Sequence, residues 1–392
     1  MNTEKPELFY PVVIVGGGPV GLYLGCLLHK NEIPFVVLEK RQESIKHSRS
    51  LGIHPVSLEL FEKLGIADQF INRGIKIRRG IAFSDSGRIG SISFEKCRRP
   101  FNYILSLPQY ITEKLLEEHL NSLNQDALLR GVEVTGIEEN DDCLRVTVTG
   151  KNDFQTIKCR CLVGCDGKHS MVRQQADISF EGDSYPDTYI MGDFTDNTSF
   201  GKDAAVFLPE DGLIESFPLI SNRRRWVVKT KEYIEEPTRH DLEERIAKRI
   251  GHDLSNTENF MLSSFGVQKL VAKPITRGRI ALAGDAAHIV SPIGGQGMNL
   301  GWLDAAELAE HLKESLVSND DRALIESLDS YARHRLEITK KVIRRAEWNM
   351  KLGRSPKLPF LRNALVWIML NTPLKRQVAR LFTMRNLKSG LL

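Results

Sequence analysis

The stretch RGRIALAGDAAHIVSPIGGQGMNLGWLDAAEL, residues 277–308, decides the fold of this chain. Residues 279–283 form a short apolar run, which ends at Gly284 and Asp285. A loop rich in glycine and proline follows, and residues 299–308 then carry apolar side chains at helical spacing. The stretch therefore predicts a strand, a loop and a helix, in that order.

The glycines of this loop suggest contact with a flat ligand. Because Gly294, Gly295 and Gly297 lack side chains, their backbone N–H groups can approach a ligand closely, and the helix after them directs the positive end of its dipole there. Asp285 could accept a hydrogen bond from a sugar hydroxyl. Glycine-rich turns before helices are common, so an ordinary turn explains this stretch equally well when it is taken alone.

The N-terminal region points independently to a nucleotide site. Residues 11–15 predict a buried strand that runs into a G-x-G-x-x-G turn, the spacing that starts a helix on a pyrophosphate. The turn comprises Gly16, Gly18, Pro19, Val20 and Gly21. A second strand, residues 35–38, ends in Glu39, and an acid at this place suits an adenosine ribose with a free 2′-hydroxyl. The predicted ligand is therefore FAD or NAD rather than NADP.

The overall composition is typical of a globular enzyme. The chain has 392 residues, of which 41% are hydrophobic and 27% charged, and this length is sufficient for two domains. A net charge of +4 is too small to indicate a nucleic-acid partner. The polar N-terminus lacks the pattern of a secretory signal, and no apolar run reaches the roughly 20 residues that span a bilayer. We therefore expect a cytoplasmic protein.

Six cysteines raise the question of a metal site or of disulfides. Cys159, Cys161 and Cys165 are close in sequence, but they lie in a strand-like run, and no second pair stands at zinc spacing. We expect buried structural thiols, with no metal and no required disulfide.

The strand and turn patterns predict an α/β fold in two parts. A Rossmann-like, three-layer nucleotide-binding domain is interrupted by an antiparallel sheet domain for the substrate, which includes a strand at residues 189–195, and a helical tail follows. The predicted nucleotide-binding domain comprises residues 1–74, 98–179 and 266–350, the sheet domain comprises residues 75–97 and 180–265, and the tail comprises residues 351–392.

The sheet domain offers several side chains to a substrate, although such residues on strands more often pack or face solvent. The candidates are Tyr185, Tyr189, Phe207, Glu215, Phe217, Arg223, Arg224 and Arg225. Arg225, at the start of a strand, could reach toward a bound cofactor. None of them is assigned as a base.

The C-terminal tail has two alternative interpretations. Its first half is apolar and its second half mixes apolar residues with Lys375, Arg376, Arg380 and Arg385, which is the composition of a pair of amphipathic helices. We favour a lid that closes over the two domains. The alternative is reversible docking to an anionic membrane, from which the enzyme would collect an apolar substrate.

Three stretches together resemble the single-component FAD aromatic hydroxylases, the para-hydroxybenzoate hydroxylase family. They are GGGPVG (residues 16–21) with Glu39, CDGKHSMVR (residues 165–173) and GDAAHIVSPIGGQGMN (residues 284–299). The run RSLGIHPVSLELFEKLGI, which begins at Arg49, is most similar to the phenol and aromatic-polyketide hydroxylase branch. The resemblance implies that the nucleotide-binding domain binds FAD.

The resemblance also implies roles for the matching residues. The implied ADP site comprises Gly16, Gly18, Pro19, Val20, Gly21, Glu39 and Lys40. At the flavin end, Asp285 would bind the ribityl chain, and Pro292 would lie beside the reactive face. The residues implied to face the flavin ring edge are Gly295, Gly297, Met298 and Asn299.

Further residues match the family's other cofactor contacts. Gln109 and Arg49 would contact the flavin, and Arg49 and Pro292 are the two residues that we expect to act in catalysis. Asp166 and Gly167 belong to a motif that touches both FAD and the nicotinamide donor. The resemblance places His169 and Arg173 at positions that handle NADPH, although a histidine at a helix start is equally often a surface residue.

The implied activity is that of an FAD-dependent monooxygenase. NADPH or NADH reduces FAD, molecular oxygen adds at flavin C4a, and the distal oxygen of the hydroperoxide is delivered to a small aromatic substrate. Because the sequence has no second G-x-G-x-x-G, the nicotinamide donor would bind transiently. The alternatives are a related flavoenzyme that epoxidises, oxidises without hydroxylating or inactivates an antibiotic, and a non-enzymatic escort protein of the Rab-GDI kind.

Overall fold

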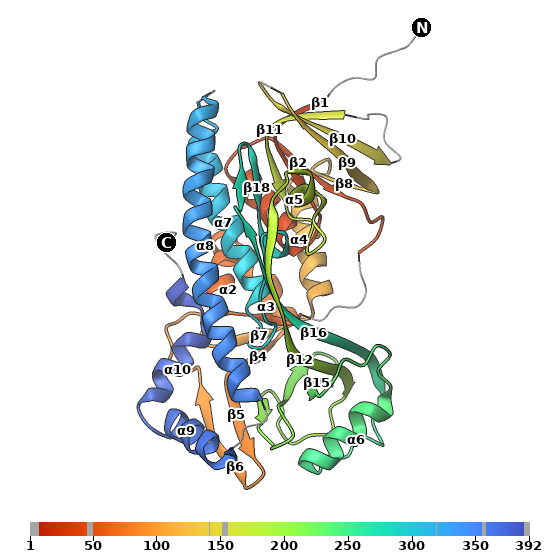
Figure 1. Cartoon of the computed structure of the whole chain (residues 1–392), viewed down its shortest axis with the longest axis vertical. Helices are drawn as coiled ribbons and strands as arrows, with labels where there is room; N and C mark the ends of the chain where they lie inside the picture. Colours follow the sequence, from red (N-terminus) through yellow and green to blue (C-terminus); the bar gives the residue numbers. More distant parts are fainter. Residues whose placement is uncertain are drawn as a thin grey trace.

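The computed structural model describes residues 8–44, 50–140, 142–150, 156–318, 320–354 and 358–387. Figure 1 shows an elongated molecule with a layered α/β part at one end and a large, mainly antiparallel sheet at the other. The helix α8 (Asp321–Gly353) runs along the side of both parts. The predicted fold class, an α/β domain interrupted by a second sheet and followed by a helical tail, is confirmed.

The first sheet belongs to the α/β part. Its strands are β1 (Leu8–Val15), β2 (Phe35–Glu39), β8 (Leu128–Arg130), β9 (Val132–Glu139), β10 (Leu144–Gly150), β11 (Thr156–Gly164), β17 (Thr276–Arg277) and β18 (Ile280–Leu282). The central order is β17-β18-β11-β1-β2-β8, in which β18, β11, β1, β2 and β8 run parallel to one another and β17 is antiparallel to β18. The strand β1 ends in four buried residues, Val12 to Val15, as expected for a parallel strand that is covered on both faces.

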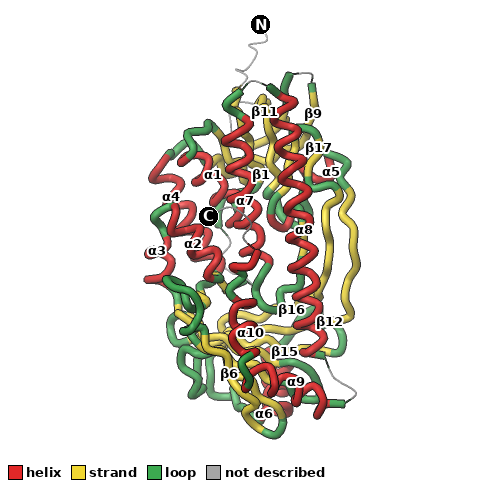
Figure 2. The backbone as a smooth tube through the Cα atoms, turned by 90° about the vertical axis from the view of Figure 1, so that its left-hand side faces the viewer, coloured by secondary structure: helices red, strands yellow, loops and turns green. Residues whose placement is uncertain are grey.

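This sheet also has an antiparallel extension, because β10 pairs with both β9 and β11 in antiparallel register. Cys159 and Cys161 lie in β11 and are fully buried, as predicted. Helices α1 (Pro19–Lys30), α4 (Gln109–Leu123) and α7 (Gly297–Ser315) lie side by side next to this sheet (Figure 2).

The second sheet forms the other end of the molecule. Its strands are β5 (Arg79–Ser84), β6 (Gly87–Ser93), β12 (Ser179–Thr195), β13 (Ala204–Phe207), β14 (Ile214–Leu219), β15 (Arg223–Thr230), β16 (Asn259–Lys273) and β19 (His288–Ile289). Their order is β19-β16-β12-β15-β14-β13-β5-β6. One face packs on α6 (Arg239–Ile250), which begins with a capping box at Thr238 and ends at Gly251 in the left-handed conformation.

The strand predicted at residues 189–195 is longer than expected, since β12 already begins at Ser179. Its first half pairs with β16, where Ser179 lies opposite Lys273. Gly182 and Asp183 are poor strand formers, but pairing with β16 overrides their local preference. Residues 185–187, which include Pro186, lie at a shift in register between Ser184 and Thr188.

The remaining elements complete the two ends. They are β3 (Gly52–Ile53), β4 (Ile75–Ile77), β7 (Ile104–Ser106), α2 (Pro55–Lys63), α3 (Ala67–Arg73), α5 (Met171–Gln175), α9 (Pro359–Asn371), α10 (Leu374–Phe382) and the 3-10 helices η1 (Gly284–Ala286) and η2 (Arg385–Leu387). The strands β3, β7 and β4 form a small third sheet. The helices α9 and α10 lie beside β6, so the tail folds back on the second sheet (Figure 1).

A buried ionic cluster ties the strand–loop–helix unit of residues 277–308 to α8. The Asp304 carboxylate in α7 accepts hydrogen bonds from the Gly284 N–H (3.0 Å), His288 Nε2 (2.6 Å) and Arg335 Nε (2.7 Å). Burial raises the pKa of Asp304, but His288 and Arg335 outweigh that effect and lower it overall. Arg335 also donates to Glu307 (3.2 Å), so its charge is fully paired.

We expect Asp304→Ala to lower the free energy of unfolding by about 3–5 kcal/mol, because it leaves the buried Arg335 without its main partner. Denaturant unfolding followed by circular dichroism measures the change. Glu326→Ala is the matched control, since Glu326 forms an exposed ion pair with Arg322 and its loss should change stability by about 0.5 kcal/mol or less. A similar small change for both variants would show that the cluster does not hold the fold.

Candidate active site

One large cavity extends between the two sheets. It has a volume of about 1320 Å³ and is lined by the glycine turn after β1, the loop of residues 284–298, one face of the second sheet, and α8, α9 and α10. Sites for single small molecules are usually about 300–1,000 Å³, so this cavity has room for a cofactor and a substrate together.

The turn after β1 is built for close approach of a ligand. Gly16 has φ +109°, and a Cβ there would lie 2.4 Å from the Cys165 carbonyl oxygen. A Cβ on Gly21 would lie 2.0 Å from the Gly16 carbonyl oxygen, so Gly21 is required by packing, and it does not line the cavity. A Cβ on Gly18 would meet nothing within 4 Å, since Gly18 faces the cavity where a pyrophosphate would lie ahead of α1.

Glu39 is a buried carboxylate in the cavity wall. It accepts hydrogen bonds from the Gly17 N–H (2.7 Å), the Arg41 N–H (2.9 Å) and Arg41 Nε (2.8 Å). Burial raises its pKa, but the hydrogen bonds and the charge of Arg41 outweigh burial and lower the pKa overall. Glu39 is therefore an ionised acceptor next to the glycine turn, and Lys40 lines the cavity beside it.

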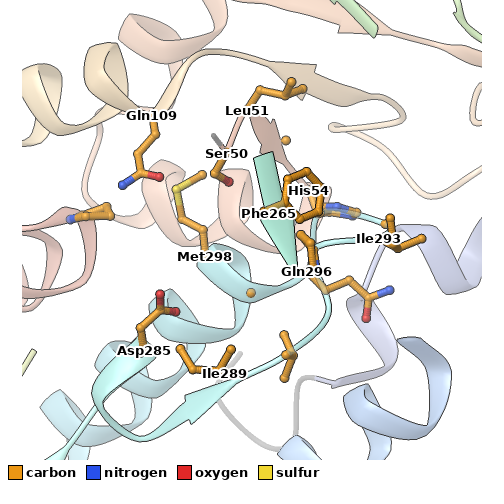
Figure 3. A pocket seen from close by; sticks show the side chains of 18 of the residues that line it. Ser50, Leu51, His54, Gln109, Phe265, Asp285, Ile289, Ile293, Gln296 and Met298 are labelled. Carbon is orange, nitrogen blue, oxygen red and sulfur yellow. The ribbon is translucent and has the colours of Figure 1, made fainter. Parts of the chain in front are cut away.

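Asp285 occupies the centre of the cavity wall. Its side chain is open to the cavity, and the structure gives it no hydrogen-bond partner among the described residues. The protein atoms around this part of the cavity disfavour a charged group, and this desolvation raises the pKa of Asp285. Figure 3 shows Asp285, Met298 and Gln109 directed toward the same space.

Asp166 also keeps one carboxylate oxygen for a ligand. Its Oδ2 accepts from the N–H groups of Met171 (2.7 Å) and Val172 (3.1 Å), at the start of α5. Its Oδ1 is buried without a partner among the described residues. Ser170 caps α5 by accepting from the Arg173 N–H (2.9 Å). Asp166 and Gly167 both line the cavity.

The loop before α7 reaches the cavity through most of its predicted residues. Pro292, Gly295, Gly297 and Met298 line it. Asn299 does not: its side chain is fully buried, and the fold uses all of its hydrogen-bonding capacity. It accepts from the His54 N–H and from Ser57 Oγ (both 2.8 Å), and it donates to the carbonyl oxygens of Gly52 (2.9 Å) and Gly295 (2.8 Å).

The other predicted cofactor contacts differ in outcome. Pro19, Val20, Gln109 and His169 line the cavity, and Gln109 Nε2 donates to Glu113 (2.7 Å). The Arg173 side chain is directed elsewhere: its guanidinium donates to the carbonyl oxygens of Ala286 (3.0 Å) and Lys168 (2.9 Å) and lies 3.8 Å from the centre of the Phe180 ring. Arg49 lies outside the described residues.

The second sheet presents only part of the predicted substrate set to the cavity. Glu215, Phe217 and Arg225 line it, whereas Phe207 and the paired, buried Arg224 pack on the opposite face. Tyr185, Tyr189 and Arg223 do not line the cavity either. Arg225 does not extend freely toward the cofactor end, because Asp193 holds its guanidinium in two hydrogen bonds of 2.7 and 2.9 Å.

The tail closes one side of the cavity, as the lid interpretation expects. Val366 and Leu370 of α9 and Phe382 of α10 line the cavity with their inward faces. The Phe382 carbonyl oxygen accepts from His54 Nδ1 (2.5 Å), which connects α10 to the start of α2. Burial lowers the pKa of His54.

Sequence reasoning missed the residues that support the site from behind. Gln296 is buried in the wall with both amide atoms unpaired among the described residues, and in Figure 3 it extends away from Asp285 on the side of Ile293. His288 and Asp304 both belong to the stretch of residues 277–308, but their pairing becomes a buried ionic cluster only through Arg335, which comes from a helix that is distant in sequence. The sequence did offer one signal, a charged residue, Asp304, among the apolar residues of a predicted helix, because a buried charge needs a partner.

These features fit FAD. Gly18 leaves open space for a pyrophosphate, and Glu39 is an ionised acceptor for a ribose. Asp285 and the free oxygen of Asp166 can accept hydrogen bonds from hydroxyl groups of the cofactor along the cavity. The cavity then continues onto the apolar face of the second sheet, where a further molecule has room.

Comparison with known proteins gives the family. Residues 10–346 match the FAD binding domain family. The uncharacterized aromatic compound monooxygenase YhjG of Bacillus subtilis strain 168 is 33% identical over 350 residues, which cover 88% of this chain and 68% of that protein. Rifampicin monooxygenase of Streptomyces venezuelae is 30% identical over 341 residues, which cover 85% of this chain and 70% of that protein.

Solved structures agree with the sequence relatives. The anhydrotetracycline hydroxylase OxyS of Streptomyces rimosus is 30% identical, with a TM-score of 0.79 over 96% of this chain and 76% of that chain. The p-nitrophenol 4-monooxygenase PnpA of Pseudomonas putida DLL-E4 has the same fold, with a TM-score of 0.85 over 96% of this chain and 98% of that chain at 23% identity. The chain therefore belongs to the FAD binding domain family, as a single-component FAD-dependent monooxygenase of the aromatic hydroxylase class.

Proposed function

We propose that this enzyme uses NADPH or NADH to hydroxylate a phenolic, polyketide or quinone-like aromatic molecule. The observation that supports this function is the single continuous cavity, which has nucleotide-type contacts at one end and an apolar sheet face at the other. Residues 75–97 and 180–265 are proposed as the substrate domain, because the strands within these limits supply most of that apolar face.

In the proposed ADP site, the glycine turn and the N-terminus of α1 bind the pyrophosphate, and Glu39 accepts from the adenosine ribose. Lys40 lies at the same end, and we propose that it adds positive charge near the phosphates. Asp285 accepts from the ribityl chain, and Asp166 offers its free Oδ1 to FAD or to the nicotinamide donor.

At the proposed flavin end, Pro292 lies beside the reactive face, and Gly295, Gly297 and Met298 surround the ring edge. When bound, FAD takes up two electrons from the donor and transfers one oxygen atom of O₂ to the substrate, while the second oxygen atom leaves as water. The N-terminus of α7 stabilises the negative charge that reduction places on the ring. Arg49 remains a predicted catalytic contact.

The protein's main task in this proposal is to exclude water from the reacting atoms. Val366, Leu370 and Phe382 of the tail cover the cavity opposite the second sheet, and their apolar side chains offer water no hydrogen bond. Water at the site would divert the oxygen chemistry to hydrogen peroxide. The lid formed by α9 and α10 is therefore proposed to couple donor oxidation to hydroxylation.

A second candidate function is a related flavoenzyme reaction, such as epoxidation, oxidation without hydroxylation, or inactivation of an antibiotic. Two relatives favour keeping it: the rifampicin monooxygenase named above, and the dialkyldecalin synthase of Streptomyces rugosporus, which is 30% identical over 334 residues.

We expect phenols and polyketide aromatics to stimulate NAD(P)H oxidation by the FAD-loaded enzyme, and the product of the best substrate to gain one oxygen atom. A screen of such compounds, with product mass as the readout, measures both effects. Consumption of the donor with hydrogen peroxide as the sole product would indicate an incorrect substrate. A product that has lost two hydrogens without gaining oxygen, or an epoxide in place of a phenol, would favour the second candidate function.

We expect Asp285→Ala to weaken FAD binding more than Glu39→Gln. The first change removes a charge-assisted hydrogen bond at the buried ring end, whereas the second only weakens one at the ribose. A loss of about 10–100-fold in affinity is expected for Asp285→Ala. Titration of the apoprotein with FAD compares the two variants with wild type. Equal losses, or the reverse order, would contradict the role proposed for Asp285.

We expect removal of the tail after Arg354 to make the protein insoluble, because it opens the apolar cavity to water. The outward face of α9 is also apolar, and its exposed side chains are Phe360, Leu361, Leu365, Trp367 and Ile368. Within the described residues, no helix is long and apolar enough to cross a membrane.

Flotation of the full chain with anionic and neutral liposomes tests the membrane alternative. The lid interpretation expects no flotation. Salt-sensitive flotation that is lost on truncation would instead support docking to lipid. Light scattering serves as the control, because a mass of two chains without flotation would assign the outward face of α9 to self-association.

A further inference from the structure

Glu215 places a carboxyl group in the mainly apolar wall that the second sheet forms, in which Arg225 is the other charged residue among those described. In the second sheet it lies between Val206 of β13 and Val227 of β15, which are directly opposite it in register. Phe217 follows it on the same face of β14. All four side chains line the cavity, while the alternate residues of β14 face the other way, so the strand period directs Glu215 into the substrate half.

Glu215 has no hydrogen-bond or ion-pair partner among the described residues. The two cations that share its sheet face on β15 are already paired: Arg225 is held by Asp193 (2.7 Å), and Lys229 is held by Asp187 (2.9 Å). Glu215 is only 9% exposed, and burial raises its pKa to about 7. The group is therefore partly ionised at neutral pH without a protein donor.

The neighbouring Tyr189 of β12 does not satisfy this carboxyl group. Its hydroxyl is buried and also lacks a partner among the described residues. Burial raises the pKa of Tyr189, and the nearby charge of Glu215 raises it further. Its ring stacks on Phe265, at 5.2 Å between centroids, and Phe265 lines the cavity. The fold thus holds Glu215 in place without consuming its hydrogen-bonding capacity.

A buried carboxylate without a donor is unfavourable, so a ligand that supplies an O–H or N–H donor gains more here than it would in water. A ligand that carries its own carboxylate would bring two like charges together in an apolar space. The same wall therefore favours one class of aromatic compound and disfavours another.

We propose that Glu215 determines substrate specificity, selecting an uncharged aromatic molecule that carries a hydroxyl group over its methyl ether and over aromatic carboxylates. This inference rests on the proposed function, because it assumes that the substrate occupies the part of the cavity formed by the second sheet. Glu215 accepts the substrate hydroxyl, while the side chains of Val206, Val227 and Phe217 contact the apolar part of the ring system.

The test uses three matched probes on the FAD-loaded enzyme, 1-naphthol, 1-methoxynaphthalene and 1-naphthoate, at about pH 8.5, where Glu215 is ionised. Binding is followed by the change in the visible absorbance of bound FAD. Wild type is expected to bind the naphthol at least about tenfold more tightly than the ether, because one hydrogen bond to a charged group corresponds to a difference in affinity of about that size. It is expected not to bind the naphthoate. Glu215→Leu should bring the ratio of naphthol to ether close to one.

Gain of naphthoate binding is the decisive readout, since a merely damaged site would not produce it. We expect it in both Glu215→Gln and Glu215→Leu, because each removes the negative charge. Glu244→Gln is the control, as Glu244 is an exposed glutamate on α6 of the same part of the molecule, and it should match wild type.

Two results would overturn the role of Glu215 alone: an unchanged preference for naphthol in Glu215→Leu, or continued exclusion of naphthoate by both variants. If wild type binds none of the three probes and no aromatic compound stimulates donor oxidation, the proposed function itself fails. The two failures are therefore distinguishable.

Discussion

The architecture of the site depends on the hydrogen bonds and ion pairs of one buried carboxylate, that of Asp304. It binds the N–H of Gly284, the ring of His288 and the guanidinium of Arg335, and so it joins the loop after β18, the helix α7 and the long helix α8. Breaking a buried pair of this kind leaves an uncompensated charge, so the three elements are fixed relative to one another. Asp285 follows Gly284 directly, so the hydrogen bond from Gly284 to Asp304 also fixes the position of Asp285 in the cavity wall.

The same arrangement explains why a polar loop can exist at the centre of the molecule. Asn299 uses its amide to join β3, the start of α2 and the loop at Gly295, and Trp302 donates to the Pro19 carbonyl oxygen (2.9 Å). These bonds satisfy backbone and side-chain groups that would otherwise be buried without partners. Asp166, Gln296 and Asp285 line the cavity and keep polar atoms without a partner among the described residues, so a ligand can supply the missing partner there.

The two ends of the cavity differ in the kind of groups that line them. Glycine turns, helix N-termini and carboxylates dominate the α/β end, as binding of a nucleotide requires, while the second sheet presents mainly Ile, Val, Ala, Phe and Met side chains. The tail helices complete the apolar end from a part of the chain that is remote in sequence. Glu215 and Arg225 are the charged residues in that mainly apolar end, but Arg225 is paired with Asp193, whereas Glu215 has no partner among the described residues. A buried carboxyl group of this kind is where selectivity for a substrate can arise.

The sequence by itself determined the family and the cofactor end of the site. This end is built from short local units of strand, turn and helix, and within such a unit the spacing of the residues predicts their relative positions. These units contain Gly16, Glu39, Asp166 and Asp285. The tertiary structure alone decided which side chains of the second sheet face the cavity. Arg224 and Arg225 are adjacent in sequence but lie on opposite faces. A register shift of one residue would exchange them, and that register is set by pairing with strands far away in the chain. For the same reason the partners of Asn299, Arg173 and Asp304 could not be read from the sequence, since hydrogen bonds between distant segments leave no periodic pattern in it.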